Sequence, residues 1–351
     1  MNVLGSRTGQ PEPARAHAIS VADIRACYLS APSGPSGARS RWPRRTTASG
    51  AGAQVARAYV QAVRLAAPRT ATPVALLHGG GGLTGACYES RLDGSPGWQH
   101  ELLRRGYQTL VVDWGGTGRA PWPGDERPGR ARPRLQSPSS MWELFRLGPP
   151  GSYSPDPARR GAYPGSRFPG ELYETFVSQV QPRFPAHARH RAAAFDALLT
   201  GAGPMALVSY SAAGPLASGA SLRHPAQVRA HVLLEPSGAP DPASTDLRPV
   251  AQIPHLFLWG DYLDSRAGGW RELYRSARRH AGALQALGAD VTWIDLPARG
   301  ITGNTHLLMF DDNAPQLLDI IATWLGRHLT GPPSGPAPIA TAWPPLPIRR
   351  R

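Results

Sequence analysis

The sequence contains no lysine, and all 38 of its basic residues are arginine. They give a formal net charge of +14, which raises the question of nucleic-acid binding. The arginines are scattered, with two groups in the Pro-containing ranges 39–45 and 119–134, and no basic motif is interleaved with aromatic residues. We therefore expect no nucleic-acid partner, and only nonspecific adhesion to acidic surfaces at low salt.

Cysteine and long apolar runs are also scarce. The two cysteines, Cys27 and Cys87, are too few for a disulfide framework, so both are expected to be free thiols. The longest apolar runs have the length of a strand, as at 74–77, whereas a helix that spans a bilayer needs about 20 apolar residues. Residues 1–20 lack the apolar stretch of a secretory signal. We predict a cytoplasmic protein with no membrane partner, and an exported one only if the start site is misassigned.

The chain divides into three parts by composition. Residues 1–50 are rich in Arg, Ser, Gly and Pro and show no apolar period, so most of this head is expected to be disordered. Residues 51–330 are expected to form one α/β domain, since 351 residues of 41% hydrophobic composition suffice for a sizeable core. Residues 331–351 form a Pro-rich tail that cannot pack as helix or sheet.

The central part alternates between strand-like and helix-like runs. After a first strand pair, strands are expected at 74–77, 109–113, 205–210, 232–234, 256–259 and 291–294, and helices at 99–105 and 314–329. This alternation predicts a mostly parallel sheet with helices on both faces. In such sheets the active site lies at the carboxyl ends of the strands.

An apolar run, MALVSYSAAG at 205–214, breaks at a serine between small residues. A nucleophilic serine on a sharp strand-to-helix turn needs small neighbours two positions away, because the strand and the helix otherwise collide. Here the serine is Ser211, and the small neighbours are Ser209 and Ala213, where glycine is usual. The string is short, so its partners elsewhere in the chain decide whether it is a nucleophile elbow.

The expected strand at 74–77 runs into His78 and four glycines. Glycines let backbone N–H groups approach the oxygen that becomes negative during acyl transfer, and the residue after the nucleophile supplies a second donor. These donors are expected to be Gly80 or Gly81, together with Ala212. A phosphate-binding loop is the alternative, but neither Gly-Lys-Ser/Thr nor G-x-G-x-x-G spacing is present.

A base and an acid for this serine lie in later parts of the chain. His306 follows the last expected strand and precedes the last expected helix, a position that favours a histidine able to take the serine proton. The acid that orients the imidazole is either Glu235, which ends the strand after the nucleophile helix, or one of Asp261 and Asp264, at the end of the next strand. Both positions keep the order serine, acid, histidine along the chain. The requirements of the triad therefore do not decide which of the two supplies the acid.

Several strings resemble, in their order, the bacterial α/β-hydrolase esterases whose triad is serine, glutamate and histidine. They are HGGGGLTG at 78–85, VVDWGGTGR at 111–119, MWELFRLGP at 141–149, LLEPSG at 233–238 and GNTHLLMFDDN at 303–313. The resemblance implies the α/β-hydrolase fold, with Ser211 as nucleophile, His306 as base and Glu235 as acid. The chain departs from the family in its all-glycine oxyanion loop and at Tyr210, where a histidine is commoner.

The alternation stops after the strand at 109–113, where aromatic residues lie among prolines. Long inserts in compact domains are usually functional, so we predict a cap over the acyl pocket at about 119–185. The alternative is that these aromatics only attach the insertion to the sheet. We expect Tyr210, Trp114 and Met309 to line the substrate pocket.

These observations together predict a serine carboxylesterase. It forms an acyl-enzyme on Ser211, acts on a small hydrophobic or aromatic ester, and needs no metal or organic cofactor. A lactonase or an acyltransferase with the same triad is the alternative among enzymes. A hydrolase-fold binding protein without turnover is the alternative from another class; such proteins typically lack a triad residue, whereas this chain has all three.

Overall fold

One eight-stranded sheet forms the centre of the computed structural model, which describes residues 18–29, 58–120, 134–182, 188–265 and 267–329. The strands lie in the order β1-β2-β4-β3-β5-β6-β7-β8. Their bounds are β1 Val21–Leu29, β2 Ala58–Leu65, β3 Val74–Leu77, β4 Thr109–Trp114, β5 Met205–Tyr210, β6 Val228–Leu234, β7 His255–Trp259 and β8 Val291–Asp295. Strand β2 runs antiparallel to both β1 and β4, and all other neighbours are parallel. The predicted mostly parallel sheet is confirmed.

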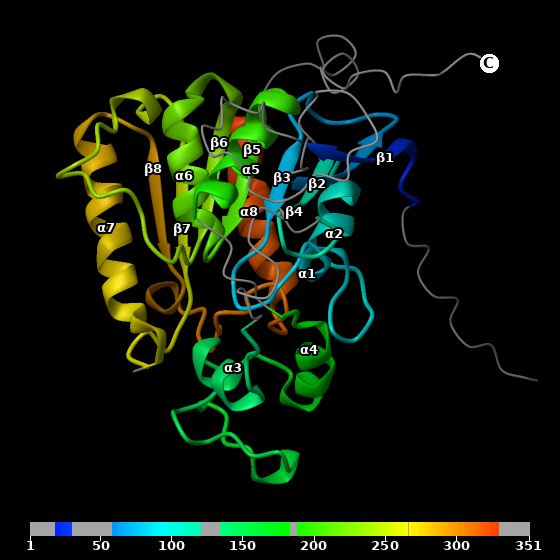
Figure 1. Cartoon of the computed structure of the whole chain (residues 1–351), viewed down its shortest axis with the longest axis vertical. Helices are drawn as coiled ribbons and strands as arrows, with labels where there is room; N and C mark the ends of the chain where they lie inside the picture. Colours follow the sequence, from blue (N-terminus) through cyan, green and yellow to red (C-terminus); the bar gives the residue numbers. More distant parts are fainter. Residues whose placement is uncertain (1–17, 30–57, 121–133, 183–187, 266, 330–351) are drawn as a thin grey trace, which may run out of the picture.

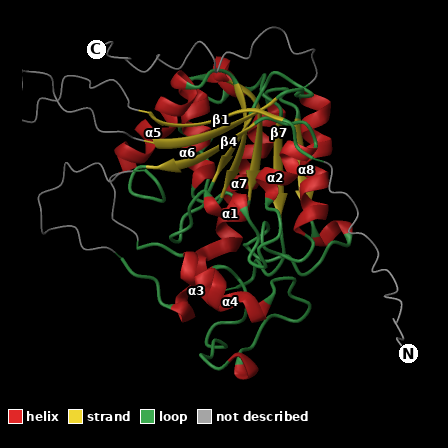
Figure 2. Ribbon diagram, turned by 90° about the vertical axis from the view of Figure 1, so that its right-hand side faces the viewer, coloured by secondary structure: helices red, strands yellow, loops and turns green. Residues whose placement is uncertain are grey.

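Helices cover both faces of this sheet (Figures 1 and 2). Their bounds are α1 Ala86–Glu89, α2 Trp98–Arg104, α3 Pro138–Leu144, α4 Tyr173–Gln179, α5 Ala188–Gly201, α6 Ala213–Arg223, α7 Trp270–Ala286 and α8 Ala314–His328. Helices α2 and α8 pack on one face, and α5, α6 and α7 pack on the other. Each face encloses its own apolar cluster, because parallel strands linked by helices are buried on both sides. No helix in the described ranges is both long and apolar enough to cross a membrane.

The edge strand β1 corrects one prediction, since it lies inside the head that we expected to be disordered. It pairs along its length with β2. Most of its side chains are exposed, with Ile24 at 63% and Tyr28 at 57%, so the strand has no buried face to produce an apolar period in the sequence. The rest of the head, 1–17 and 30–57, and the tail from 330 onward lie outside the described residues.

The long insertion lies between β4 and β5 and carries α3 and α4, which lie below the carboxyl ends of the strands in Figure 1. Its described aromatic side chains pack on one another, edge to face in several pairs. Those that are buried in the core are Trp142, Phe145, Phe168, Tyr173 and Phe176. They share an apolar cluster with side chains of the sheet and so attach the insertion to it, and the cap over the acyl pocket stays a prediction. Parts of the predicted range, 121–133 and 183–187, lie outside the described residues.

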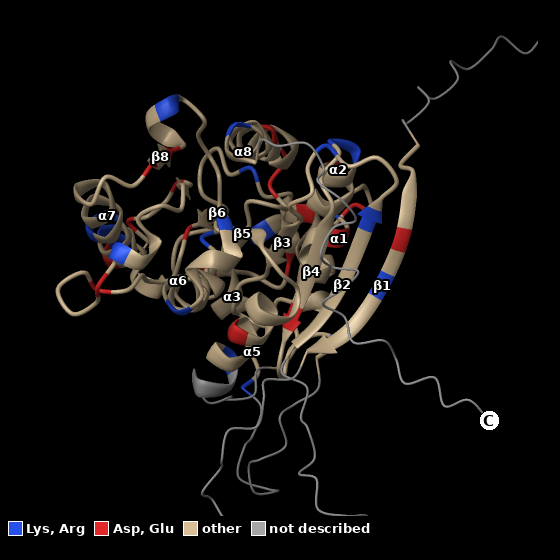
Figure 3. Ribbon diagram, turned by 90° about the horizontal axis from the view of Figure 1, so that it is seen from above, with Lys and Arg blue, Asp and Glu red and all other residues tan. Residues whose placement is uncertain are grey.

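Basic residues lie on several of the described helices, strands and loops, interspersed with acidic ones, and do not follow one element (Figure 3). Several form ion pairs, including Arg105 with Asp319 at 2.6 Å and Arg248 with Asp246 at 2.9 Å. This distribution gives no continuous basic stripe in the described part of the chain. The expectation of no nucleic-acid partner stays a prediction.

Candidate active site

The turn after β5 places a serine in a strained conformation. Ser211 follows the last residue of β5 and has a backbone φ of +52°, a region that residues other than glycine rarely adopt. Helix α6 then begins at Ala213, whose side chain is fully buried, and a Cβ on the next residue, Gly214, would lie 2.5 Å from Pro236. The small residues around the serine therefore allow the strand, the helix and the following loop to approach closely.

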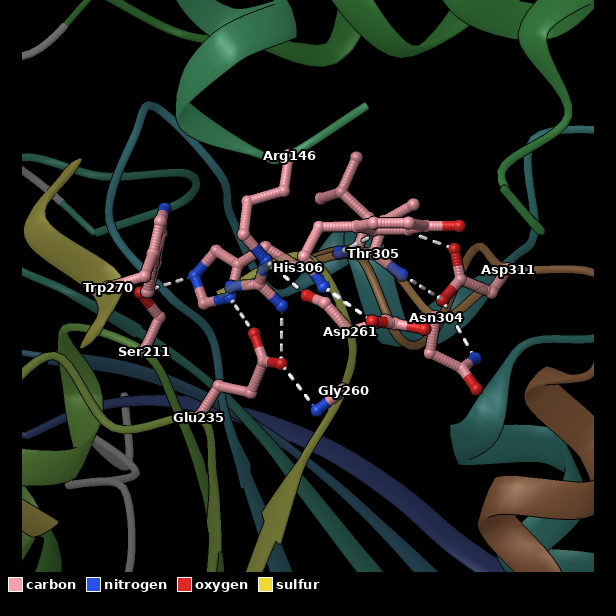
Figure 4. Close-up of polar contacts among 12 residues, drawn as sticks. Arg146, Ser211, Glu235, Gly260, Asp261, Trp270, Asn304, Thr305, His306 and Asp311 are labelled. Carbon is pink, nitrogen blue, oxygen red and sulfur yellow. Dashed lines mark hydrogen bonds and ion pairs between the residues drawn. The ribbon is translucent and has the colours of Figure 1, made fainter. Parts of the chain in front are cut away.

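Three predicted side chains meet at the carboxyl edge of the sheet (Figure 4). The Ser211 Oγ lies 2.9 Å from Nε2 of His306, and Nδ1 of His306 hydrogen-bonds Oε2 of Glu235. The other carboxylate oxygen of Glu235 accepts the backbone N–H of Gly260 at 2.7 Å and Nη2 of Arg146 at 2.5 Å. The structure thus brings together the serine, histidine and glutamate that the sequence pointed to, and adds a buried arginine.

Burial and charge set the protonation of these groups. Burial lowers the pKa of His306 to about 4, against the opposing effect of the Glu235 carboxylate. Burial would raise the pKa of Glu235, but the charge of Arg146 and the contact with His306 hold it below its ordinary value. At neutral pH the pair is therefore a carboxylate and a neutral imidazole. When Nδ1–H donates to Glu235, Nε2 is free to accept a proton from Ser211.

The other two candidates for the triad acid, Asp264 and Asp261, make different contacts. The side chain of Asp264 is 76% exposed and forms an ion pair with Arg271. The carboxylate of Asp261 accepts the backbone N–H groups of Tyr262 and Gly303, at 2.8 Å and 3.1 Å. Neither carboxylate makes a recorded hydrogen bond to the His306 ring within the described residues.

The glycine loop after β3 lies beside the serine turn. A Cβ on Gly79 would lie 3.1 Å from Cβ of Ser211, and one on Gly80 would lie 3.2 Å from Cβ of Ala212. Gly81 has a φ of +74°, and a Cβ there would lie 2.6 Å from the Phe145 ring. Among the described residues, the N–H groups of Gly80 and Ala212 have no recorded hydrogen-bond partner. They are therefore available to a ligand.

A network behind the loop fixes its path. The buried ring of His78 donates from Nδ1 to the carbonyl oxygen of Gly79 at 2.7 Å and stacks on Trp114, with ring centroids 3.7 Å apart. The carboxylate of Asp113 accepts the N–H of Gly85 at 2.7 Å, and it is paired with Arg119 at 3.0 Å. Both ends of the loop are thus attached to residues at the end of β4.

The three residues expected to line a pocket have different places. Trp114 lines a small groove, together with Gly80, Leu83, Ala212 and other residues. Tyr210 is fully buried, and its hydroxyl donates to the carbonyl oxygen of His306 at 2.7 Å. Met309 is a core residue that is 1% exposed. Neither Tyr210 nor Met309 lines that groove, so for these two the pocket prediction is not supported.

A larger cavity, of about 650 Å³, lies at the ends of β7 and β8. Its lining includes Gly260, Asp261, Asp264 and Asp295 but neither Ser211 nor His306. The lining of the small groove beside the glycine loop also lacks Ser211 and His306, but it includes Gly80 and Ala212, so the groove is the better candidate for an acyl or alcohol group. Among the described residues, no group of three or more His, Cys, Asp or Glu side chains could hold a metal ion.

Sequence reasoning missed a set of side chains that hold the histidine loop. The fully buried carboxylate of Asp311 accepts the N–H and the hydroxyl of Thr305, at 2.9 Å and 2.8 Å, and the side-chain amide of Asn304 at 2.9 Å. The ring of Trp270, at the start of α7, lies 4.0 Å from that of His306. The string GNTHLLMFDDN contains Asn304, Thr305 and Asp311, but no local pattern distinguished Asp311 from an acidic residue on the surface.

Comparison with known proteins agrees with this architecture. No protein-family model matches the chain. It is 24% identical over 297 residues to a protein named "Probable secreted lipase phiG" from Fungal sp. (strain ATCC 74256), covering 71% of this chain and 80% of that protein. It is also similar to the atomic-resolution structure of a novel bacterial esterase, with a TM-score of 0.74 and 24% identity over 93% of this chain and 100% of that one.

The likeness to the bacterial esterase shows that the chain has the α/β-hydrolase fold, so the predicted fold class is confirmed. The chain is thus similar to one protein called an esterase and to another called a lipase. The name of the fungal relative describes that protein as secreted, which bears on the alternative of export and leaves the predicted location a prediction.

Proposed function

We propose that this protein is a serine hydrolase of carboxylic esters, with Ser211 as nucleophile, His306 as general base and Glu235 as the acid that orients the imidazole. The observation that carries the proposal is the pair of hydrogen bonds that runs from Ser211 through His306 to Glu235. The names of the two similar proteins, an esterase and a lipase, support the same class of reaction.

In this proposal, the Ser211 Oγ attacks the ester carbonyl while Nε2 of His306 takes its proton. The imidazolium is stabilised by the Glu235 carboxylate and then gives the proton to the leaving alcohol, which leaves an acyl group on Ser211. Water, activated by the same imidazole, releases the carboxylic acid and restores the serine. Because His306 is neutral at pH 7, it is ready to act as a base without prior loss of a proton.

The oxyanion of the tetrahedral intermediate needs two N–H donors at about 3 Å. We assign these to Ala212 and Gly80, with Gly81 as the neighbour that the loop could present instead. The position of Gly80 beside Ala212, and the unpaired N–H groups of both residues in the described structure, support this assignment. The N–H group of Gly81 also has no hydrogen-bond partner among the described residues, so Gly81 stays the alternative donor.

The groove beside these donors supports a proposal for the substrate class. Its lining includes the apolar side chains of Leu83, Trp114, Pro182 and Leu216. We propose that it takes a hydrophobic or aromatic group of the ester and that the insertion caps it, so that water is excluded from the developing charge. Gln181, which follows α4, also lines the groove, and its N–H donates to the carbonyl oxygen of Gly82 at 2.8 Å.

The test combines labelling by a fluorophosphonate probe with hydrolysis of p-nitrophenyl esters. The proteins compared are the wild type, Ser211→Ala, Glu235→Gln and Asp264→Asn. The last is the matched control, because it neutralises an exposed carboxylate on the neighbouring strand end. We expect Ser211→Ala to abolish both labelling and turnover and Glu235→Gln to lower turnover by roughly 10³–10⁴-fold. The Asp264→Asn protein should match the wild type.

Three results would count against the proposal. A wild type that is neither labelled nor active on any ester would refute it outright. Labelling without turnover would favour the binding protein. A large loss in Asp264→Asn with none in Glu235→Gln would show that the acid is misassigned.

A further inference from the structure

The insertion places a buried arginine against the acid of the proposed triad (Figure 4). Arg146 follows α3, has a φ of +57° and is fully buried. Its Nη2 donates to Oε1 of Glu235 at 2.5 Å, and its Nε donates to the carbonyl oxygen of Asp261 at 2.8 Å. Its guanidinium lies over the ring of Trp270, 4.7 Å from the centroid. One side chain of the insertion thus contacts the residue that follows β6, the loop after β7, and the start of α7.

The preceding residue, Phe145, contacts the proposed base. Its carbonyl oxygen accepts the backbone N–H of His306 at 3.0 Å, and its ring stacks on the His306 imidazole with centroids 5.9 Å apart. Two consecutive residues of one strained turn therefore hold both Glu235 and His306. A positive φ at a residue that is not glycine is costly, so it persists only where the surrounding contacts require it.

We propose that Arg146 is a positioning residue that the insertion contributes to the Glu235–His306 pair, so that docking of the insertion sets both the orientation and the net charge of that pair. The inference rests on the proposed function, because it assigns a role in the same reaction. It goes further in making the insertion a part of the catalytic machinery as well as a cover over the pocket.

The net charge of the buried cluster determines the sign of the effect on the pKa of the pair. With Arg146 in place, the buried cluster of guanidinium, carboxylate and neutral imidazole has zero net charge, and protonation of His306 makes it +1. Without Arg146 the cluster starts at −1, and the same proton brings it to zero. A proton enters a buried anionic cluster more readily than a neutral one, so loss of Arg146 raises the apparent pKa of the pair. In agreement, the charge of Arg146 adds to the lowering of the His306 pKa.

Other titratable groups around the pair have their own partners. Tyr210, from β5, donates its hydroxyl to the carbonyl oxygen of His306. Asp261, after β7, accepts backbone N–H groups, and Asp311 accepts donors from the loop that carries His306. Among the described residues, Arg146 is the cation in direct contact with Glu235. Its removal is therefore the change that alters the charge of the pair directly.

The insertion offers a matched control in Arg160. The side chain of Arg160 is 3% exposed and lies over the rings of Trp142, Tyr153 and Tyr173, and it forms an ion pair with Glu174. Arg146→Met and Arg160→Met thus each remove a buried guanidinium that lies over aromatic rings in the same insertion. Of these two arginine side chains, only that of Arg146 contacts Glu235. Arg146→Lys keeps the charge and loses the fork geometry.

The first experiment measures the rate of fluorophosphonate labelling and kcat/KM from pH 3.5 to 8 in the wild type and these three variants. In Arg146→Met we expect the acid limb to move to higher pH by about 1–3 units and the rate at pH 8 to fall by up to about 100-fold. In Arg146→Lys, the acid limb should lie close to its position in the wild type. Arg160→Met should keep the wild-type limb, even if its thermal stability falls. An unmoved limb in Arg146→Met overturns the proposal, whatever happens to the rate.

The second experiment does not depend on catalysis. The ¹⁵N shifts of the His306 imidazole are followed through a pH titration in histidine-labelled protein, with the signal assigned from a His306→Gln variant. A higher midpoint in Arg146→Met than in the wild type supports the proposal, even if no ester is hydrolysed and the proposed function fails. Equal midpoints overturn it. If Arg146→Met does not fold, the double variant Arg146→Met/Glu235→Gln is compared with Glu235→Gln. Because the charge of Arg146 acts on His306 directly, a higher midpoint in the double variant supports the proposal and equal midpoints overturn it.

Discussion

His255 provides a test of how the interior of this protein responds to acid. It is the first residue of β7 and is 3% exposed, with its ring centroid 5.9 Å from that of His231. Burial, with a smaller contribution from His280, lowers its pKa from 6.5 to about 4. Between these two values the unfolded chain binds a proton that the folded chain excludes.

The size and sign of the effect follow from this difference. Because the unfolded state binds more protons, the free energy of unfolding rises with pH, and the contribution of His255 is lost as the pH falls from 6.5 toward 4. Between pH 7 and pH 5 the two pKa values correspond to a loss of about 2 kcal/mol from this residue alone. Replacement by leucine removes the titration. It also removes Nδ1, a buried atom without a hydrogen-bond partner in the described structure.

The assay is urea denaturation at pH 7, 6 and 5 for the wild type, His255→Leu and the surface control His100→Gln. The free energy of unfolding should fall by about 2 kcal/mol less in His255→Leu than in the wild type over this range. Other buried groups are present in both proteins, so they largely cancel in the difference. The pKa of His231 is lowered in part by His255, and loss of that effect acts in the same direction. Equal losses in the wild type and His255→Leu would refute the reasoning.

Four further predictions address the site and the scaffold. Ester hydrolysis should fall as the pH drops through about 4, because His306 must be neutral, and an acid limb near pH 6.5 would contradict this. Gly79→Ala should reduce kcat, because its Cβ would lie 2.7 Å from the Tyr210 ring, and unchanged kinetics would contradict it. Asp311→Asn should lower the free energy of unfolding by about 1–3 kcal/mol, because a neutral amide would replace a carboxylate that accepts three hydrogen bonds; urea denaturation at pH 8 measures this, and an unchanged midpoint would contradict it. Gly282→Ala, at an exposed position of α7 with open space around the Cβ, should raise the thermal midpoint by an amount equivalent to about 0.5–1 kcal/mol, whereas a lower midpoint would contradict it.

The central elements were predictable because they are strongly periodic or fully buried. Strands β3 and β5 have the predicted bounds, and α8 ends one residue before the expected position. Strand β6 was predicted from residue 232 but begins at Val228. Its early part contains His231, whose Nε2 hydrogen-bonds Ser209 Oγ at 2.8 Å inside the sheet. A buried polar pair of this kind finds its partners only in three dimensions, so the apolar run from which the strand was predicted begins after it.

The candidate site was predictable in its types of residue and in their order along the chain. Ser211 and His306 follow from the small residues at the turn and from the position of the last strand and helix. Glu235 was chosen over Asp264 by resemblance, since both lie at strand ends. The structure places Glu235 on the imidazole, because β5 and β6 are neighbours and the acid follows β6 at once with a φ of +42°.

The sequence by itself determined the layers of the fold and the loops that carry the chemistry, because apolar period, glycine content and the succession of elements are read directly along the chain. It did not determine which distant side chains meet in the interior. Arg146 is one of 38 basic residues, and the string MWELFRLGP that contains it assigned no role to the arginine. Only the docking of the insertion on β6 and α7 brings its guanidinium to a buried carboxylate 89 residues away. That contact depends on burial and charge in three dimensions, which no spacing along the chain records.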